Sequence, residues 1–370
     1  MNEIISLLGV REGDRILDPF CGSGTTLLVA AESGIEAVGY DVMRFPVFVS
    51  NTKLLRPRIA AIKKYERFFS VKTIDAIKTK IKFDISTINK VFDKKTLNFL
   101  VRFREKIRRI DDPGVRAIFL LCLLKTLEPV SNSKKSGGFL RIVEKENLRK
   151  RDVLRIFKKY LAEVKDDIRS NEITFRGNAR AFVGDSRNIQ PDEIFDAVIS
   201  SPPYPNRHDY TRVYLLEEAI GFDRNDREIK QVRYKTLRSH VEAKKQFEAE
   251  GYTKPKELQE ILEKMAKKEL NNSKIIEMLE GFFEDMFITL KALKKIVKRG
   301  GRIAFVISNA RYAGVGVPTD TLLSQIGELA GLKPESILVL RYRGNSYQQT
   351  VKYNKDPARE SLVVWKNCGH

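Results

Sequence analysis

The chain has 370 residues, 42% of them hydrophobic and 31% charged, with a formal net charge of +20 at pH 7. That length predicts about two to three domain-sized units. No apolar run is long enough to span a bilayer, no secretory signal is recognisable, and the three scattered cysteines fit a reducing compartment, so we expect a soluble cytoplasmic protein without structural zinc, other metal or disulfides.

A strand, a glycine turn and a helix are predicted first. A buried strand at 15–17 leads into Asp18-Pro19-Phe20-Cys21-Gly22-Ser23-Gly24-Thr25, and a helix follows over 25–33. Gly22 and Gly24 allow the backbone to pass close to a ligand, which the first amides of the helix would face. A GxG motif alone is weak evidence for this cofactor, because many dinucleotide-binding sites share it. The departure from GxGxxG and the preceding Asp18 favour a zwitterionic nucleoside cofactor over a pyrophosphate.

A second strand at 37–41 ends in Asp41, 17 residues beyond Gly24. Its carboxylate is placed to accept hydrogen bonds from ribose hydroxyls, and we assign Asp41 and the adjacent Val42 to the cofactor site. The alternative is a tight strand–helix turn in which Asp41 is an ordinary helix cap.

The next segment is basic and helical. Helical periodicity runs from 44 to about 171, and residues 131–138 have the composition of a mobile loop. Residues 51–178 hold 33 Lys and Arg against 15 Asp and Glu. Such a surplus repels itself unless a polyanion neutralises it, which predicts nucleic-acid contact through 51–178; the alternative is a solvated helical surface. The abundance of Lys, Glu and Arg also hints at a thermophilic source.

Strand character returns at 181–185 and 195–200. Asp185, followed by Ser186, ends the first of these strands, where its carboxylate can accept from an adenine amino group or the ribose. Gly-Asp-Ser is also a good turn and N-cap, so the structural alternative stays open.

The remaining elements complete an alternation of strands and helices. They are a helical stretch at 211–275, a helix at 275–297, a strand at 302–307, a helix at 321–330 and two strands at 337–342 and 361–365. The alternation predicts an α/β fold with a mostly parallel, doubly wound sheet and a hairpin at one edge.

Strand 195–200 leads into Ser201-Pro202-Pro203-Tyr204. The exocyclic amine of a nucleobase is a poor nucleophile, and its methylation needs acceptors for its N–H groups. Ser201 supplies a side-chain oxygen, Pro202 a carbonyl that Pro203 aims, and Tyr204 a flat face for an extracted base. Parallel strands end at one edge of a sheet, so this turn and the glycine turn point into one crevice. The alternative is a proline-stiffened loop with a packed tyrosine.

Five residues that follow are expected to line the same mouth: Asn206, Arg207, His208, Tyr210 and Arg212. The two arginines can meet phosphates and Tyr210 can stack or pack, while His208 has a structural or substrate-positioning role. The late polar loop at 343–349 touches substrate or is an exposed hairpin loop.

The pair DPFCGSGTT and SPPY resembles the amino-methyltransferases that use S-adenosylmethionine to methylate cytosine N4 or adenine N6. The serine-led form is similar to the cytosine-N4 branch. The resemblance covers about half the chain, at 13–50, 179–212 and, less specifically, 280–310 and 337–366. It implies a Rossmann-like, seven-stranded methyltransferase sheet with a terminal antiparallel hairpin.

The resemblance also implies S-adenosyl-L-methionine as cofactor and assigns residues by position. The cofactor set is Asp18, Pro19, Phe20, Cys21, Gly22, Ser23, Gly24, Thr25, Asp41, Val42, Asp185 and Ser186, and the catalytic set is Ser201, Pro202, Pro203 and Tyr204. Cys21 does not follow a proline pair, which argues against a cysteine-nucleophile route to C5-methylcytosine. Two features depart from the family pattern: 14 residues precede Arg15, and the basic insertion separates the second and third strands.

We therefore expect methylation of cytosine N4 in a polynucleotide, with DNA as the family default and structured RNA such as ribosomal RNA second. The alternatives are adenine N6 and a catalytically silent nucleic-acid-binding subunit; a small-molecule methyltransferase would leave the basic insertion without purpose. The expected domains are a discontinuous catalytic core at 1–50 and 179–370, a basic helical insertion at 51–178 and a smaller helical insertion at 211–275. The sequence leaves the oligomeric state open.

Overall fold

The computed structural model describes residues 1–79, 85–145, 148–170, 175–189, 193–223, 225–343 and 357–369. The chain divides into two compact units. The first, called here the sheet unit, comprises Met1–Val42, Phe175–His208 and Arg233–His370. The second, the helical unit, comprises Met43–Thr174 and Asp209–Val232.

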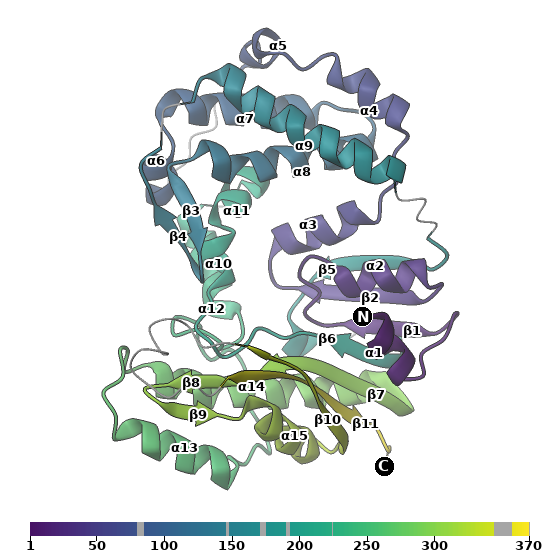
Figure 1. Cartoon of the computed structure of the whole chain (residues 1–370), viewed down its shortest axis with the longest axis vertical. Coiled ribbons are helices and arrows are strands. Elements are labelled where there is room, and N and C mark those ends of the chain that lie inside the picture. Colours follow the sequence, from purple (N-terminus) through teal and green to yellow (C-terminus); the bar gives the residue numbers. More distant parts are fainter. Residues whose placement is uncertain are drawn as a thin grey trace. The chain divides into compact units, whose positions relative to one another are not determined.

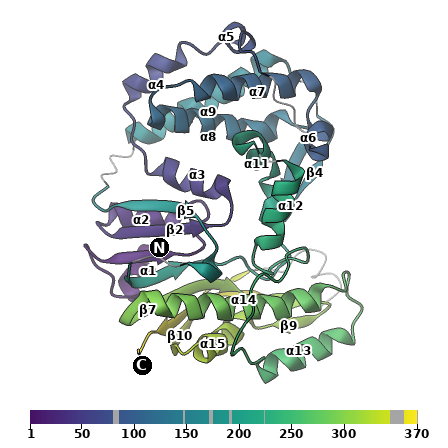
Figure 2. The same ribbon diagram turned by 180° about the vertical axis from the view of Figure 1, so that it is seen from behind.

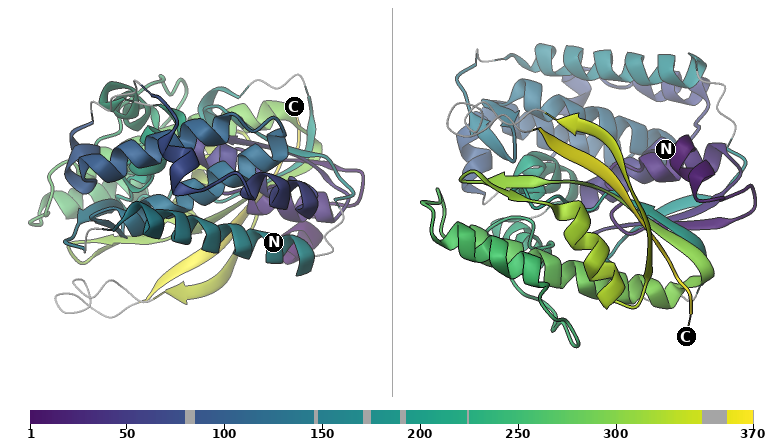
Figure 3. Two further views of the ribbon diagram at one scale, coloured as in Figure 1. Left: turned by 90° about the horizontal axis from the view of Figure 1, so that it is seen from above. Right: turned by 60° about the horizontal axis from the view of Figure 1, so that its bottom comes forward.

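The sheet unit is built on seven strands in the order β10-β11-β7-β6-β1-β2-β5 (Figure 1). Their bounds, in that order, are Lys333–Arg343, Ala358–Lys366, Val297–Ser308, Phe195–Ser200, Arg15–Asp18, Glu36–Asp41 and Ala179–Val183. The pairs β7–β6, β6–β1, β1–β2 and β2–β5 are parallel, whereas β10–β11 and β11–β7 are antiparallel. The predicted mostly parallel sheet with a terminal antiparallel hairpin is confirmed. The hairpin strands are prominent in yellow in Figure 3.

Burial on both faces explains why the central strands form. Ile16 and Leu17 of β1 are fully buried and pair in register with Ala197 and Val198 of β6. Near-continuous apolar runs are typical of parallel strands covered on both faces. This burial places the carboxyl ends of β1 and β6 side by side, where both turns identified in the sequence begin.

The helices of the sheet unit pack against the strands. They are α1 Asn2–Leu7, α2 Thr25–Glu32, η1 Ser186–Asn188, α13 Lys256–Ala266, α14 Ile275–Ile296 and α15 Thr319–Leu329, and a small pair of strands, β8 Ala310–Tyr312 and β9 Val315–Val317, completes the unit. α2 packs against β1, β2 and β5, and α14 and α15 pack against each other and β7. Figure 2 shows α14 running along the sheet. The core is dense here: Phe305 and Trp365, both fully buried, meet edge to face at 5.8 Å.

The helical unit has its own core. Its helices are α3 Arg44–Lys53, α4 Ile59–Glu66, α5 Val71–Asp75, α6 Ser86–Val91, α7 Lys94–Arg108, α8 Pro113–Val130, α9 Lys150–Ser170, α10 Tyr210–Val213 and α11 Leu215–Phe222; α12 Asp226–Lys235 begins in it and ends in the sheet unit. Four phenylalanine rings, Phe69, Phe103, Phe119 and Phe157, pack together where α7, α8 and α9 meet. Asp112 caps α8 by accepting from the Val115 amide at 2.9 Å, and Pro113 opens the helix.

The prediction of a mobile loop at 131–138 is wrong. Strand β3 Ser133–Ser136 pairs antiparallel with β4 Phe139–Ile142, and Gly137 turns between them with a φ of 58°. One face of this hairpin packs inward, since Lys135 Nζ donates to Glu217 at 2.5 Å and Leu140 joins the helical core. These tertiary contacts hold strands whose local sequence is that of a loop.

The expected insertion at 211–275 is divided between the two units. α10 and α11 pack in the helical unit, whereas Arg233 onward, with α13, belongs to the sheet unit. Most of the expected loop at 343–349 lies outside the described residues. In the part of the chain that the structure describes, no helix has the length and apolar character needed to cross a membrane.

Candidate active site

The glycine turn lies at the end of β1 and leads directly into α2. Gly22 and Gly24 have φ values of 49° and 80°, and Gly24 is the N-cap of α2. The Cys21 amide donates to the Tyr40 carbonyl at 2.8 Å, and the Gly24 amide donates to the Cys21 carbonyl at 2.8 Å, so the turn is fixed to β2. Ser23 and Thr25 are exposed at its tip, while Pro19, Cys21 and Gly24 are buried.

A glycine in β2 makes room for this turn. A Cβ at Gly39 would lie 2.7 Å from the Cys21 Cβ and 2.9 Å from a Leu27 methyl carbon. The strand and the turn therefore approach more closely than any side chain at position 39 allows.

Asp18 joins the glycine turn to the neighbouring strand. The Ser200 hydroxyl, at the end of β6, donates to Asp18 Oδ1 at 2.5 Å, and the Phe20 amide donates to the same oxygen at 3.1 Å. Burial raises the pKa of Asp18 above its ordinary value, against the lowering effect of hydrogen bonds from Ser200, Thr26 and Phe20. Asp18 thus organises the start of both turns.

Asp41 ends β2 beside the glycine turn. Its carbonyl accepts from the Gly184 amide at 3.0 Å, which fixes the ends of β2 and β5 together. A Cβ at Gly184 would lie 2.6 Å from the Tyr40 ring, so this junction is also tight. Asp41 and Val42 are half-buried, at the same edge of the sheet as the turn.

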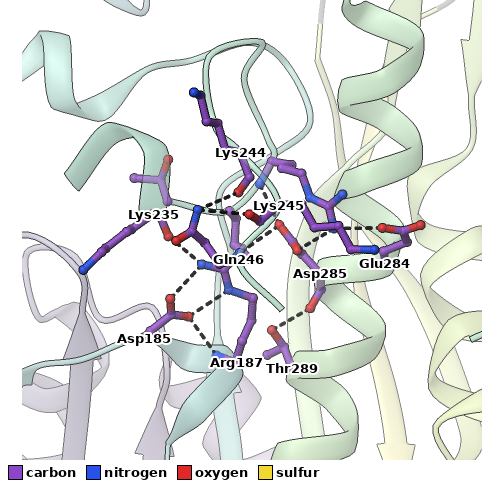
Figure 4. A network of polar contacts seen from close by, with 12 residues as sticks. Asp185, Arg187, Lys235, Lys244, Lys245, Gln246, Glu284, Asp285 and Thr289 are labelled. Carbon is purple, nitrogen blue, oxygen red and sulfur yellow. Dashed lines mark hydrogen bonds and ion pairs between the residues drawn. The ribbon is translucent and has the colours of Figure 1, made fainter. Parts of the chain in front are cut away.

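Asp185 lies in a buried polar network (Figure 4). It caps η1 through the Arg187 amide at 3.0 Å, and both of its oxygens accept from the Arg187 guanidinium, at 2.9 and 2.7 Å. Arg187 also donates to Asp285 of α14 at 3.1 Å, and Asp285 accepts from Arg238 at 2.8 Å. Burial would lower the pKa of Arg187, but the two carboxylates outweigh burial and raise it, so Arg187 stays a cation. The neighbouring Ser186 is buried.

Next to this network is a pocket of about 340 Å³. It is lined by Asp185, Asn188, Lys235, Gln246 and Phe247. The Arg187 guanidinium lies 5.0 Å from the centre of the Phe247 ring, so a cation–aromatic contact holds this lining residue against the network.

Ser201 and Tyr204 contact each other in the turn after β6. The Ser201 hydroxyl donates to Tyr204 Oη at 3.3 Å, and Tyr204 Oη donates to Glu360 Oε1 at 2.9 Å. Ser201 is exposed, Pro202 is buried, and Pro203 and Tyr204 are half-buried. The solvent-accessible Ser201 oxygen therefore lies beside the Tyr204 ring, whose hydroxyl is bonded to Glu360.

Two further hydrogen bonds fix the residues that follow Tyr204. Tyr312 Oη, buried on β8, donates to the Pro205 carbonyl at 2.5 Å, and the Asn206 amide donates to the Tyr204 carbonyl at 2.7 Å. Burial raises the pKa of Tyr312, so its hydroxyl keeps its proton for this bond.

The five residues expected to line the mouth fall into both units. Arg207, with a φ of 69°, donates to Asn271 Oδ1 at 2.9 Å, and the His208 amide donates to Asn206 Oδ1 at 3.1 Å, all within the sheet unit. Tyr210 and Arg212 belong to the helical unit, where Tyr210 is 41% exposed and Arg212 pairs with Asp209 at 3.2 Å.

Several residues of the site carry no sequence signal. Arg187, Asp285 and Glu360 join the site through partners far away in the chain, and each alone reads as an ordinary surface charge. Gly39 and Ser200 lie within predicted strands, and their importance follows only from the register. Among the described residues, no group of three or more His, Cys, Asp or Glu is placed to hold a metal ion.

Comparison with known proteins finds methyltransferases among the relatives of this chain. A family profile described as "DNA methylase" matches residues 1–47. The chain is 30% identical over 421 residues to the type II methyltransferase M.BsoBI of Geobacillus stearothermophilus, covering 99% of this chain and 82% of that protein. It is 28% identical over 414 residues to the type II methyltransferase M.AvaI of Nostoc sp., covering 99% and 83%. A solved TehB-like SAM-dependent methyltransferase from Corynebacterium glutamicum is 10% identical, with a TM-score of 0.32 and coverage of 98% and 85%.

The sheet order, the glycine turn and the profile match define an S-adenosylmethionine-dependent DNA amino-methyltransferase. The chain belongs to the type II methyltransferase family, as its similarity to M.BsoBI shows. The chemistry at the glycine turn fits the cofactor: positive-φ glycines and the first amides of α2 lie at one sheet edge with the carboxylate-bearing Asp41.

Proposed function

We propose that the chain methylates the N4 amine of cytosine in DNA at the turn Ser201–Tyr204. One observation carries the proposal: the bond between Ser200 and Asp18 ties the start of the substrate turn to the start of the glycine turn. Two turns that begin at neighbouring strand ends, 2.5 Å apart at this bond, suit a methyl donor and an amine that must meet in line.

The chain's own residues supply positioning and acceptors. Ser201 Oγ and the Pro202 carbonyl accept the two N–H groups of the amine, which favours a pyramidal nitrogen with an available lone pair. The Tyr204 ring gives the extracted base a face to stack on. The glycine turn, the amides of α2 and Asp41 bind the cofactor, which supplies a methyl group on a positively charged sulfur. Preorganised dipoles contribute most of the rate, and no covalent enzyme intermediate is needed.

The serine that opens the substrate turn supports cytosine over adenine. Ser201 is a neutral hydroxyl at the position where adenine-N6 enzymes more often carry an aspartate, as the family resemblance implies. Its contact with Tyr204 leaves the oxygen's lone pairs available to an amine.

The helical unit is proposed to grip the DNA backbone. Its β3–β4 hairpin presents Lys134, Phe139 and Arg141 as exposed side chains on one face. Lys134 and Arg141 are directly opposite in register, and like charges so placed repel each other. Phosphates between them would relieve that repulsion, and a two-stranded ribbon is narrow enough to enter a major groove.

Product analysis tests the proposal. Purified chain is incubated with isotopically labelled cofactor and separate pools of unmethylated DNA and ribosomal RNA, and each pool is digested to nucleosides for mass spectrometry. We expect label in N4-methylcytosine from DNA. Label in N6-methyladenine, or in RNA alone, would overturn the assignment, and a Ser201→Ala variant is the negative control for the site.

A further inference from the structure

A chain of hydrogen bonds leads from the substrate turn to the terminal hairpin. Ser201 donates to Tyr204, and Tyr204 donates to Glu360 on β11. Glu360 is only 4% exposed, and its second oxygen accepts from the Arg341 guanidinium on the neighbouring strand β10. The chain thus ends on a buried carboxylate with its own cation.

The chemistry of these groups fixes the direction of every bond. An ionised carboxylate has no proton and can only accept. The neighbouring guanidinium favours the ionised form of Glu360, since an opposite charge in contact stabilises a charge. Tyr204 therefore donates its hydroxyl proton to Glu360, and the Tyr204 oxygen accepts from the Ser201 hydroxyl. Ser201 has one hydroxyl proton, which it donates to Tyr204.

We propose that Glu360 is a positioning residue that acts through Tyr204 to make the Ser201 hydroxyl an acceptor for the amine of the target base. Without this chain, the Ser201 hydroxyl is free to rotate, and it can then point its proton at the amine. The inference rests on the role proposed for Ser201 and adds to it the residue that sets the polarity of that hydroxyl.

A simpler role for Glu360 is to anchor the Tyr204 ring for stacking. Both roles need the Tyr204 hydroxyl, which Tyr204→Phe removes while keeping the stacking face, so this variant tests whether the hydrogen bond to Glu360 matters at all. The two roles differ in the Ser201→Ala background, where loss of the ring anchor still slows methyl transfer and loss of hydroxyl polarity does not.

A double-mutant cycle separates the effects. Single-turnover methylation rates are measured for the wild type, Glu360→Gln, Ser201→Ala and the double variant, together with KM for DNA and cofactor Kd by calorimetry. We expect Glu360→Gln and Tyr204→Phe each to slow methyl transfer by about tenfold, the equivalent of about 1.4 kcal/mol, with KM and Kd little changed. In the Ser201→Ala background, Glu360→Gln should cause no further loss, because the hydroxyl that it orients is gone.

The control removes an ion pair from the same hairpin. Glu335 pairs with Arg302 at 2.6 Å near the start of β10, and Glu335→Gln should leave the rate unchanged. Additive losses in the double variant, or a normal rate for Tyr204→Phe, would overturn the inference while leaving Ser201 in its role. A normal rate for Ser201→Ala would instead reject the proposed role of the turn.

Discussion

At the scale of single residues, Asp18 is the carboxyl that links the glycine turn to the end of β6. It accepts from Ser200 and Phe20 at the same oxygen, and it is 4% exposed. Burial of a carboxylate disfavours its charged form, and here that effect exceeds what the hydrogen bonds return. The fold therefore keeps a carboxyl whose ionised form costs stability, which is typical of functional positions.

The raised pKa of Asp18 predicts how stability depends on pH. The folded chain binds a proton at Asp18 more tightly than the unfolded chain, so this carboxyl stabilises the fold at low pH and loses that effect as pH rises from its ordinary value of 3.8 through the raised pKa. Asp18→Asn keeps an acceptor for Ser200 without the charge. We expect the variant to gain stability relative to the wild type across that range, measured by urea unfolding at pH 4 to 8. Parallel pH profiles for the two proteins would contradict this account.

At the scale of elements, the terminal hairpin is anchored to α15 by close packing. Trp365 of β11 is fully buried, and its indole N–H donates to the Ser324 carbonyl at 3.1 Å. Gly327 of α15 lies directly beneath it: a Cβ there would be 2.1 Å from Trp365 Nε1 and 2.5 Å from Cδ1. The indole also meets the Phe305 ring, so it has no room to retreat.

This contact predicts that Gly327→Ala destabilises the sheet unit by about 1–3 kcal/mol through overpacking. The matched control is Gly316→Ala in β9, where a new Cβ would meet no heavy atom within 4 Å. Urea unfolding should show a lowered midpoint for the first variant and a nearly unchanged one for the second. Equal midpoints would mean that the helix shifts to accommodate the methyl group.

Some elements of the fold were predictable from the sequence and others were not. The strands at 15–17, 37–41 and 195–200 were predictable because two-sided burial leaves short apolar runs, and the motifs at their ends located both turns. The β3–β4 hairpin was not, since Lys134, Lys135 and the glycines look like loop composition and are ordered by Glu217 and the helical core. Glu360 and Arg187 were also beyond reach, because their roles depend on partners brought close only by the fold.

At the scale of the whole molecule, we expect charge to govern the binding of DNA. Most of the net charge of +20 lies in residues 51–178, which belong almost entirely to the helical unit. Each phosphate that the protein neutralises releases counterions, so affinity falls steeply with salt.

We expect the double variant Lys134→Gln and Arg141→Gln to weaken DNA binding and to reduce the slope of log Kd against log salt by up to about two. The control is Lys256→Gln and Lys264→Gln on α13 of the sheet unit, an equal loss of exposed charge. Fluorescence anisotropy with a labelled duplex at several salt concentrations measures both. Equal slopes for the two double variants would show that the hairpin holds no phosphates.

The division of the chain also has a consequence for the order of folding. Val38 of β2 pairs with Arg180 of β5, and the helical unit between them needs α11, which is translated only after β6. Closing so long a loop is entropically costly and slow. On the ribosome, β1 and β2 must therefore wait without their outer neighbours β6 and β5 while the intervening helices emerge, and neither core can consolidate until synthesis is well past the midpoint. Chaperone dependence during expression is the foreseeable result of a sheet whose neighbours are delivered so late.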